Sequence, residues 1–211
     1  MLRLISATPS PYARKVRIAL AEKGIPFELV TEVPWDSTTA TPQYNPLEKL
    51  PVLLLPDGGS VYESHFILEW LEAYYPTPPL LPQDIAGRLA ARQVEVLADG
   101  VCDAFVLLFF ERHRAADQQS EAWIARQRRK IDGGLRALAR VAGDRQWLVG
   151  DCFGLADIAC GTLVRYLDVR FPELPWRALH PNLAALSDRL EQRPSFRGSV
   201  PVPQVISDRV V

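Results

Sequence analysis

Apolar and polar residues in the first eighty positions alternate between the spacing of strands and the spacing of helices. The segments LRLIS and VLLL are short and apolar, FELVTEV alternates apolar with polar residues, and SVY follows the turn sequence PDGG. Two other segments repeat apolar residues every three or four positions. We therefore predict strands over residues 2–6, 27–33, 52–55 and 60–62, and helices over residues 11–23 and 63–75.

The order of these elements predicts a small α/β domain. A strand, a helix and a second strand imply a parallel pair, and the PDGG turn adds an antiparallel pair. The Pro-, Ser- and Thr-rich segment between them reads as a loop with one irregular turn. The resulting order is βαβαββα, and such a mixed sheet is the arrangement of a thioredoxin-like domain.

The pattern changes at a proline-rich connector. Residues 76–84 read PTPPLLPQD, a stiff and extended sequence. Almost everything after it has helical periodicity, so we predict an all-α C-terminal domain over residues 84–211 behind an N-terminal domain over residues 1–77. Its helices are expected over residues 84–112, 120–141, 155–170 and 181–192.

Composition excludes several classes of function. Hydrophobic residues make up 48% of the 211 residues, enough for a sizeable core, and the formal net charge of -1 gives no sign of a nucleic-acid partner. The longest apolar runs are too short to cross a membrane, and we expect no signal peptide. The three cysteines, Cys102, Cys152 and Cys160, have no metal-binding spacing. We expect reduced, mostly buried thiols, no metal, and a cytoplasmic protein.

The stretch TPSPYARKVRIALAEKG carries a helix start and a helix stop. Ser10 can cap the helix, Pro11 suits its first turn, and Gly24 can end it. A hydroxyl beside a helix N-terminus can also hold an anion, including a bound thiolate. Local sequence alone favours the helix cap, with the anion-holding role as the alternative for Ser10.

Four stretches together give the chain a recognisable family pattern: SPYARKVRIALAEKGIPFE, NPLEKLPVL, YESHFILEWLE and GDCFGLADI. In this order and spacing the chain resembles a cytosolic glutathione S-transferase, near the serine-type theta, zeta and related bacterial branches. The resemblance covers almost the whole chain. It implies glutathione as co-substrate, a small electrophile as second substrate, no metal, and a homodimer.

The resemblance also implies roles for single residues in the N-terminal domain. Ser10 matches the catalytic serine, which donates a hydrogen bond to the glutathione sulfur, with Tyr12 as a competing donor. Pro51 is expected in the cis form, turning the backbone of Val52 towards the cysteinyl part. The other glutathione contacts implied are Lys49 for the glycyl carboxylate, Leu50 beside it, Glu63 for the γ-glutamyl ammonium, and Ser64 for the γ-glutamyl carboxylate.

An electrophile pocket is expected between the domains. Phe105, Phe109 and Arg112 share one face of the first long helix because their spacing is i, i+4 and i+7. The other candidates for its walls are Tyr12, Trp35, Tyr166 and Trp176. Arg112 hints at an anionic group on the electrophile. In the stretch GDCFGLADI, we expect Asp157 to cap the helix that starts after Gly154 rather than to act in catalysis.

The resemblance therefore implies a transferase that ionises the thiol of glutathione for attack on an apolar electrophile. Two alternatives remain. A glutathione-dependent isomerase of the zeta type would carry a Ser-Ser-Cys run, where this chain has Ser10, Pro11 and Tyr12. A non-catalytic binding or regulatory protein of the same fold is the other alternative, and the presence together of Lys49, Pro51, Glu63 and Ser64 argues against it.

Overall fold

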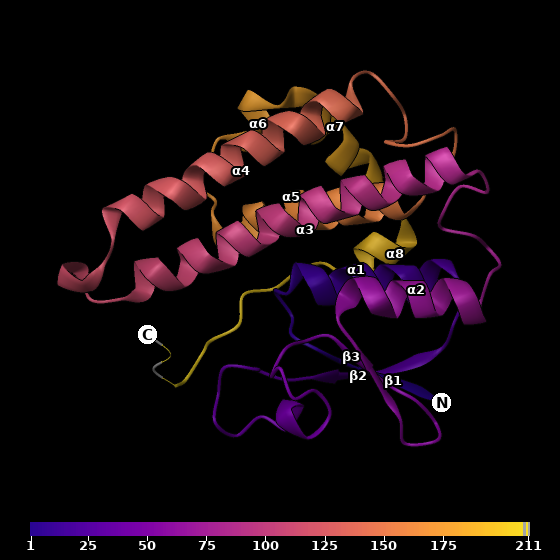
Figure 1. Ribbon diagram of the computed structural model, residues 1–211, viewed down its shortest axis with the longest axis horizontal. Helices are drawn as coiled ribbons and strands as arrows, with labels where there is room; N and C mark the ends of the chain where they lie inside the picture. The colour runs from indigo at the N-terminus through magenta and orange to yellow at the C-terminus, as the bar shows by residue number, and fades with distance from the viewer. Residues whose placement is uncertain (209, 211) are drawn as a thin grey trace.

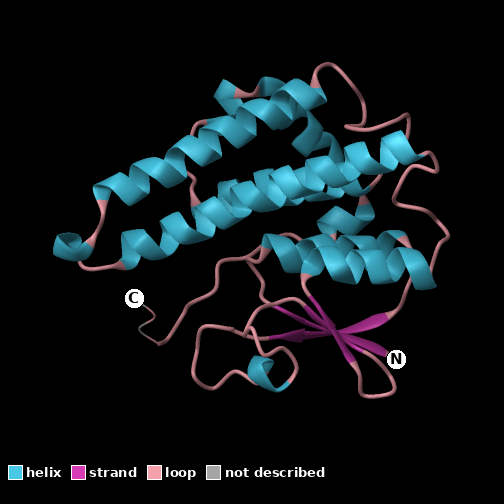
Figure 2. Ribbon diagram, in the orientation of Figure 1, coloured by secondary structure: helices cyan, strands magenta, loops and turns pink. Residues whose placement is uncertain are grey.

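The computed structural model describes residues 1–208 and 210, and it combines a small sheet with a larger set of helices (Figures 1 and 2). The N-terminal part contains four strands, two α-helices and one 3-10 turn. Their bounds are β1 Leu2–Ser6, α1 Pro11–Glu22, β2 Phe27–Thr31, η1 Thr41–Gln43, β3 Val52–Leu54, β4 Ser60–Tyr62 and α2 Ser64–Tyr74.

The sheet has the mixed topology that the sequence predicts. Its strand order is β2-β1-β3-β4, with β1 parallel to β2 and antiparallel to β3, and β3 antiparallel to β4. The fold class is therefore confirmed, with one difference. The second helical element of the order βαβαββα is only η1, because its segment holds the prolines and polar residues of a loop.

The C-terminal part is helical throughout. Its elements are α3 Ile85–His113, η2 Ala116–Gln118, α4 Glu121–Ala142, α5 Leu155–Arg170, α6 Trp176–Leu179, α7 Pro181–Leu190 and α8 Pro194–Arg197. The four longest agree with the predicted ranges to within about two residues, as expected where apolar periodicity is strong. None of the helices in residues 1–208 and 210 is both long and apolar enough to cross a membrane.

The elements form layers. Figure 1 shows α1 and α2 side by side, between the sheet on one side and α3 with α5 on the other. Leu4 and Leu53 of the sheet are fully buried under these helices, as are Val16 and Leu20 of α1. The buried cluster on the opposite face of the sheet is smaller, and the loop between β2 and β3, which includes Tyr44, packs against it.

Buried charges join the two parts of the chain. Lys15 of α1 is fully buried, and its Nζ lies 3.0 Å from Glu95 Oε1 and 2.6 Å from Asp99 Oδ2, both on α3. Arg14, only 1% exposed, reaches Glu191 beyond α7 at 2.8 Å. Because a buried charge without a partner is very costly, these pairs fix how α1 docks on the helical layer.

Candidate functional site

At one end of the sheet, β1 and β4 end and β3 begins. The register places Ile5 of β1 beside Val52 at the start of β3, and Val52 beside Tyr62 at the end of β4. Segments that leave β1 and β4 and the segment that leads into β3 therefore converge there. The predicted residues just beyond this end are Ser10, Pro51, Glu63 and Ser64.

Ser10 is both a helix cap and a free hydrogen-bond donor. Its Oγ accepts the N–H of Ala13 at 3.2 Å, which satisfies one of the open amides of the first turn of α1. Its hydroxyl hydrogen has no acceptor among the described residues. The two roles left open by the sequence are therefore compatible, since capping uses the oxygen lone pair and leaves the hydrogen.

The hydroxyl of Tyr12 already has a hydrogen-bond partner on another element. Its hydroxyl donates to Asp103 of α3, across the junction of sheet domain and helical domain. Burial first, and then nearby Cys102 and Asp103, raise the pKa of Tyr12 far above its ordinary range. The single hydroxyl hydrogen of Tyr12 is thus already in use.

Ser64 is a buried polar group without a partner. It is fully buried at the first position of α2, and its Oγ has no hydrogen-bond partner among the described residues. An unpaired buried hydroxyl costs about 1–3 kcal/mol, so it calls for a ligand or a water. Its place at the positive end of α2 favours an anion.

Glu63 itself has an unusual backbone conformation. Its φ is 72°, in the left-handed region that is costly for a residue with a Cβ. Its carboxylate accepts the N–H of Ser64 at 2.9 Å, and the side chain is exposed. An exposed carboxylate therefore lies next to the buried Ser64 hydroxyl, which could donate a hydrogen bond to an anion.

The segment before β3 lies at the same end. The Leu50–Pro51 peptide bond is cis, as the family resemblance implies. Val52 is fully buried, and Leu50 is half-buried against the small cluster on the loop-covered face. Lys49 is exposed and has no ion pair among the described residues, while its carbonyl accepts from Asn45 at 2.8 Å.

Three of the aromatic residues expected on the electrophile's side belong to the core. Phe105 is 1% exposed, Tyr166 5% and Trp176 2%. The first two pack on Phe171, with ring centroids 4.6 and 6.5 Å away, and the Trp176 indole donates to Asp168 at 2.9 Å. Helical spacing on a buried helix selects core residues, so these side chains offer no surface that a ligand could touch.

The other candidates lie nearer the surface. Trp35 is 45% exposed and its ring is 4.3 Å from that of Phe110, a contact between the β2–β3 loop and α3. Phe109 is half-buried and lies 5.3 Å from Phe110. Arg112 is paired with Glu173 at 2.7 Å. Trp35 therefore contacts the helical domain, and its partner there is Phe110, which the sequence analysis did not identify.

Comparison with known proteins gives a consistent result over the whole chain. Family models for the glutathione S-transferase N-terminal and C-terminal domains match residues 9–73 and 121–189. A solved glutathione S-transferase from Methylobacterium radiotolerans, in complex with glutathione sulfonate, is 71% identical with a TM-score of 0.98, covering 100% of this chain and 99% of that one. The uncharacterized GST-like protein YibF of Escherichia coli K12 is 38% identical over 200 residues, 95% of this chain and 98% of YibF.

This chain belongs to the glutathione S-transferase family. The relatives include more than one activity. The maleylacetoacetate isomerase of Pseudomonas aeruginosa is 30% identical over 216 residues, covering 96% of this chain and 97% of the isomerase.

Asp157 has the capping role that was expected. In this glutathione S-transferase α5 begins after Gly154, which has no side chain to cap it. Asp157 is 1% exposed, and its carboxylate accepts the N–H of Leu148 at 2.9 Å and that of Gly154 at 3.0 Å. Burial raises the pKa of Asp157 to about 6, against the lowering effect of these bonds.

In the part of this glutathione S-transferase that the structure describes, neither the cysteines nor the other ligating side chains form a metal site. Cys102 and Cys160 are buried, Cys152 is exposed, and all three are free thiols. Burial raises the pKa of Cys160 to about 12. Across residues 1–208 and 210, no group of three or more His, Cys, Asp or Glu side chains could hold an ion.

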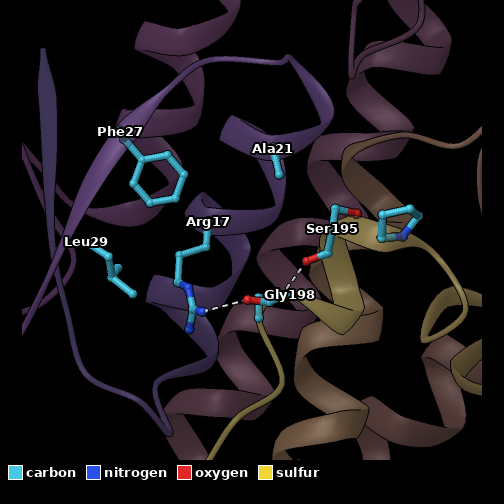
Figure 3. A pocket seen from close by; sticks show the side chains of 8 residues that line it. Arg17, Ala21, Phe27, Leu29, Ser195 and Gly198 are labelled. Atoms are coloured by element: carbon cyan, nitrogen blue, oxygen red, sulfur yellow. Dashed lines mark hydrogen bonds between the residues drawn. The ribbon is translucent and has the colours of Figure 1, made fainter.

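A surface hollow lies away from the site (Figure 3). Its volume is about 240 Å³, and it lies between α1, the edge strand β2 and the segment around α8. Arg17 crosses it and donates to the carbonyl of Gly198 at 3.0 Å. No predicted site residue of this glutathione S-transferase lines it.

Asp103 and Phe110 are the residues that sequence reasoning missed. Both lie on α3, seven residues apart and so on one face of the helix. That spacing was available in the sequence, and the same face turns to Tyr12 and Trp35 in the structure. Neither contact has a local signal, because each joins segments more than seventy residues apart.

Proposed function

We propose that this chain is a glutathione transferase that holds glutathione at the end of its sheet and ionises its thiol. The observation that carries the proposal is the buried, unpartnered hydroxyl of Ser64 at the N-terminus of α2. Glutathione has a carboxylate that suits this position and an adjacent ammonium that suits Glu63. Family membership supports the same assignment.

The remaining groups of the tripeptide find complements nearby. The backbone of Val52, turned by the cis bond at Pro51, would pair with the cysteinyl part. Lys49 would meet the glycyl carboxylate, and Leu50 would lie against it. The bound tripeptide then has both ends neutralised, with its sulfur near Ser10.

Ser10 would stabilise the thiolate. A free cysteine thiol has a pKa of about 8.5. Lowering the pKa of the bound thiol by one unit takes about 1.4 kcal/mol of preferential binding to the thiolate. The free hydroxyl hydrogen of Ser10 and the amides at the start of α1 can provide it. Tyr12 is the weaker candidate because its hydrogen is donated to Asp103.

The thiolate would then attack an electrophile held between the domains. A sulfur–carbon bond forms as the leaving group departs with its electron pair, and no covalent enzyme intermediate is needed. Trp35 and Phe109 would line this side, with Phe110 between them, and Arg112 would lie at its rim. The contribution of the protein is proximity and stabilisation of the charged sulfur.

The test is a titration of bound glutathione combined with a change at Ser10. Wild-type protein should bind glutathione and show the ultraviolet band of a thiolate at neutral pH. In Ser10→Ala the band should disappear at pH 7, and kcat with an aryl halide should fall by about 100-fold, with little loss of glutathione affinity.

Ser120→Ala is the matched control. Ser120 caps α4 in the same way, accepting the N–H of Trp123 at 3.3 Å, but lies far from the sheet. Each substitution should destabilise the fold by about 1 kcal/mol through the lost cap. Equal activity in the two variants would return Ser10 to a purely structural role.

Glutathione-dependent isomerisation is the second candidate. The similarity to a maleylacetoacetate isomerase favours it, while Pro11 and Tyr12 stand where a zeta-type enzyme would carry Ser and Cys. Conversion of the cis double bond of maleylacetoacetate to trans, without net loss of glutathione, would identify it. Glutathione binding without turnover of any electrophile would instead point to a binding or regulatory protein.

The proposal includes the organisation of the protein. The glutathione-binding domain would end at residue 77 and the helical domain would start at residue 84. A homodimer would form through the apolar side chains exposed on α2 and α3. The unpaired state of all three cysteines supports the cytoplasm as its compartment.

A further inference from the structure

The chain that follows α8 returns to the N-terminal domain (Figure 1). The Thr8 hydroxyl donates to the carbonyl of Val202 at 2.9 Å, and the Val202 N–H lies 3.4 Å from the carbonyl of Thr8. Thr8 is two residues before Ser10. The C-terminal segment, residues 199–208, therefore passes beside the loop that carries the proposed sulfur donor.

Two carboxylates fasten this segment to the β2–β3 loop in a reciprocal way. Asp36 Oδ1 accepts the N–H of Ser207 at 2.8 Å and that of Asp208 at 3.2 Å. In return, the carboxylate of Asp208 accepts the N–H of Ser37. Hydrogen bonds from amides to carboxylates are stronger than those between neutral groups. The bond from Ser37 also lowers the pKa of Asp208, which keeps that carboxylate charged.

The loop held in this way carries Trp35. Residues 32–40 contain no strand or helix, so side-chain and turn hydrogen bonds hold them in place. Glu32 fixes the far end of the loop by accepting the N–H of Ala40 at 3.0 Å, and Gln204 donates to the Glu32 carbonyl at 3.2 Å. Trp35 lies directly before Asp36, and its ring contacts Phe110.

We propose that Asp36 and Asp208 are positioning residues for the transferase reaction: their clasp on the C-terminal segment holds Trp35 against α3 and so forms the wall that meets the electrophile. This inference rests on the proposed function, since it takes the electrophile to lie between the domains. The clasp touches neither substrate. The clasp acts through the loop. Removing it should therefore weaken binding of the part of the product that comes from the electrophile, and should leave glutathione binding unchanged.

The test compares two ligands on three variants. Glutathione probes the thiol side alone, and S-(2,4-dinitrophenyl)glutathione adds an aryl group on the electrophile's side. Asp36→Ala removes the clasp, and Asp36→Asn keeps an oxygen acceptor. Asp57→Ala is the control, because Asp57 also accepts a backbone N–H, from Gly59 at 3.0 Å, but in the distant β3–β4 turn.

Asp36→Ala should bind glutathione within about twofold of wild type and the conjugate about tenfold more weakly. Asp36→Asn should restore most of the conjugate affinity, and Asp57→Ala should bind both ligands normally. By hydrogen exchange, the amides of Ser37, Ser207 and Asp208 should lose protection in Asp36→Ala, while those of α5 keep theirs.

Two results would overturn the inference. One is unchanged exchange at Ser207 and Asp208 in Asp36→Ala, and the other is an equal loss of conjugate affinity in Asp36→Ala and Asp57→Ala. Failure of the wild-type protein to bind either ligand would refute the proposed function, and the clasp would then be judged by the exchange measurement.

Discussion

Two serine hydroxyls at the same end of the sheet are in opposite states. Ser10 already accepts one hydrogen bond from its own helix, whereas Ser64 is buried with none. A folded protein that leaves a polar group buried and unpaired gives up stability there. At a binding site, a ligand that accepts a hydrogen bond from the buried hydroxyl removes this cost. Replacing Ser64 should therefore not lower the stability of the unliganded protein, but it should lower the affinity for glutathione.

Ser64→Ala tests this directly. Removing the unpaired hydroxyl should leave the free energy of unfolding of the unliganded protein unchanged or raise it by about 1 kcal/mol. Glutathione affinity should fall by about tenfold or more, because a hydrogen bond to a carboxylate is lost. Chemical denaturation and calorimetry measure the two effects.

Ser187→Ala provides the comparison. Ser187 of α7 is 1% exposed, and its Oγ is also without a partner among the described residues. Its substitution should have the same small effect on stability and none on glutathione binding. Equal glutathione affinity in the two variants would remove Ser64 from the site.

At the scale of elements, the start of α5 depends on one carboxylate. Asp157 holds the amides of Leu148 and Gly154, and the Leu155 N–H donates to the Leu80 carbonyl of the connector at 2.7 Å. The helix start is thereby joined to both the preceding loop and the interdomain segment. Because burial is the largest influence on Asp157 and raises its pKa, the folded chain holds the proton of this carboxyl more tightly than the unfolded chain does.

Stability should therefore depend on pH through Asp157. Its folded pKa of about 6 lies above the ordinary aspartate value of 3.8, so the folded state binds more protons between these values. The stabilising contribution is complete below pH 3.8 and is lost as the pH rises through 6. Relative to Asp157→Asn, the wild-type free energy of unfolding should fall by about 2 kcal/mol from pH 4 to pH 7. Urea titrations of both proteins measure this, and a pH-independent difference would contradict it.

Most elements could be predicted from the sequence because their signals are local. Apolar periodicity located α5 at residues 155–170, and the PDGG turn located the β3–β4 hairpin. The polar, proline-rich segment of η1 was correctly read as a loop, although the fold order counts it as a helix. Periodicity fails for Arg14 and Lys15, which are charged and yet buried, since their partners come from helices far along the chain.

At the scale of the whole molecule, long-range contacts decide what the sequence could not. The clasp between Asp36 and Asp208 joins positions 172 residues apart, and Tyr12 meets Asp103 over 91 residues. No pattern of neighbours along the chain encodes such pairs. The candidate glutathione residues came from short motifs that resemble the family's, and the sheet register brings their segments to one end of the sheet, whereas the electrophile's side depends on how the two domains meet.

The proposed homodimer is the prediction that belongs to the scale of the whole molecule. The helices α2 and α3 expose apolar side chains that a monomer would leave in water. On α3 they repeat at i, i+4 and i+11, along one face. They are Phe66 (53% exposed), Tyr74 (68%), Ile85 (77%), Leu89 (65%) and Val96 (64%). Large apolar side chains as exposed as these are typical of a protein interface.

Val96→Arg should therefore separate the proposed dimer. A charge buried in an apolar interface without a partner costs several kcal/mol, enough to shift association at micromolar concentration. By analytical ultracentrifugation the wild-type chain should sediment at twice its 23.6 kDa mass and the variant as a monomer. Leu179→Arg is the control, because Leu179 is equally exposed, at 66%, but lies on α6. If Val96→Arg stayed dimeric, or if both variants dissociated alike, the interface would have to lie elsewhere than on α2 and α3.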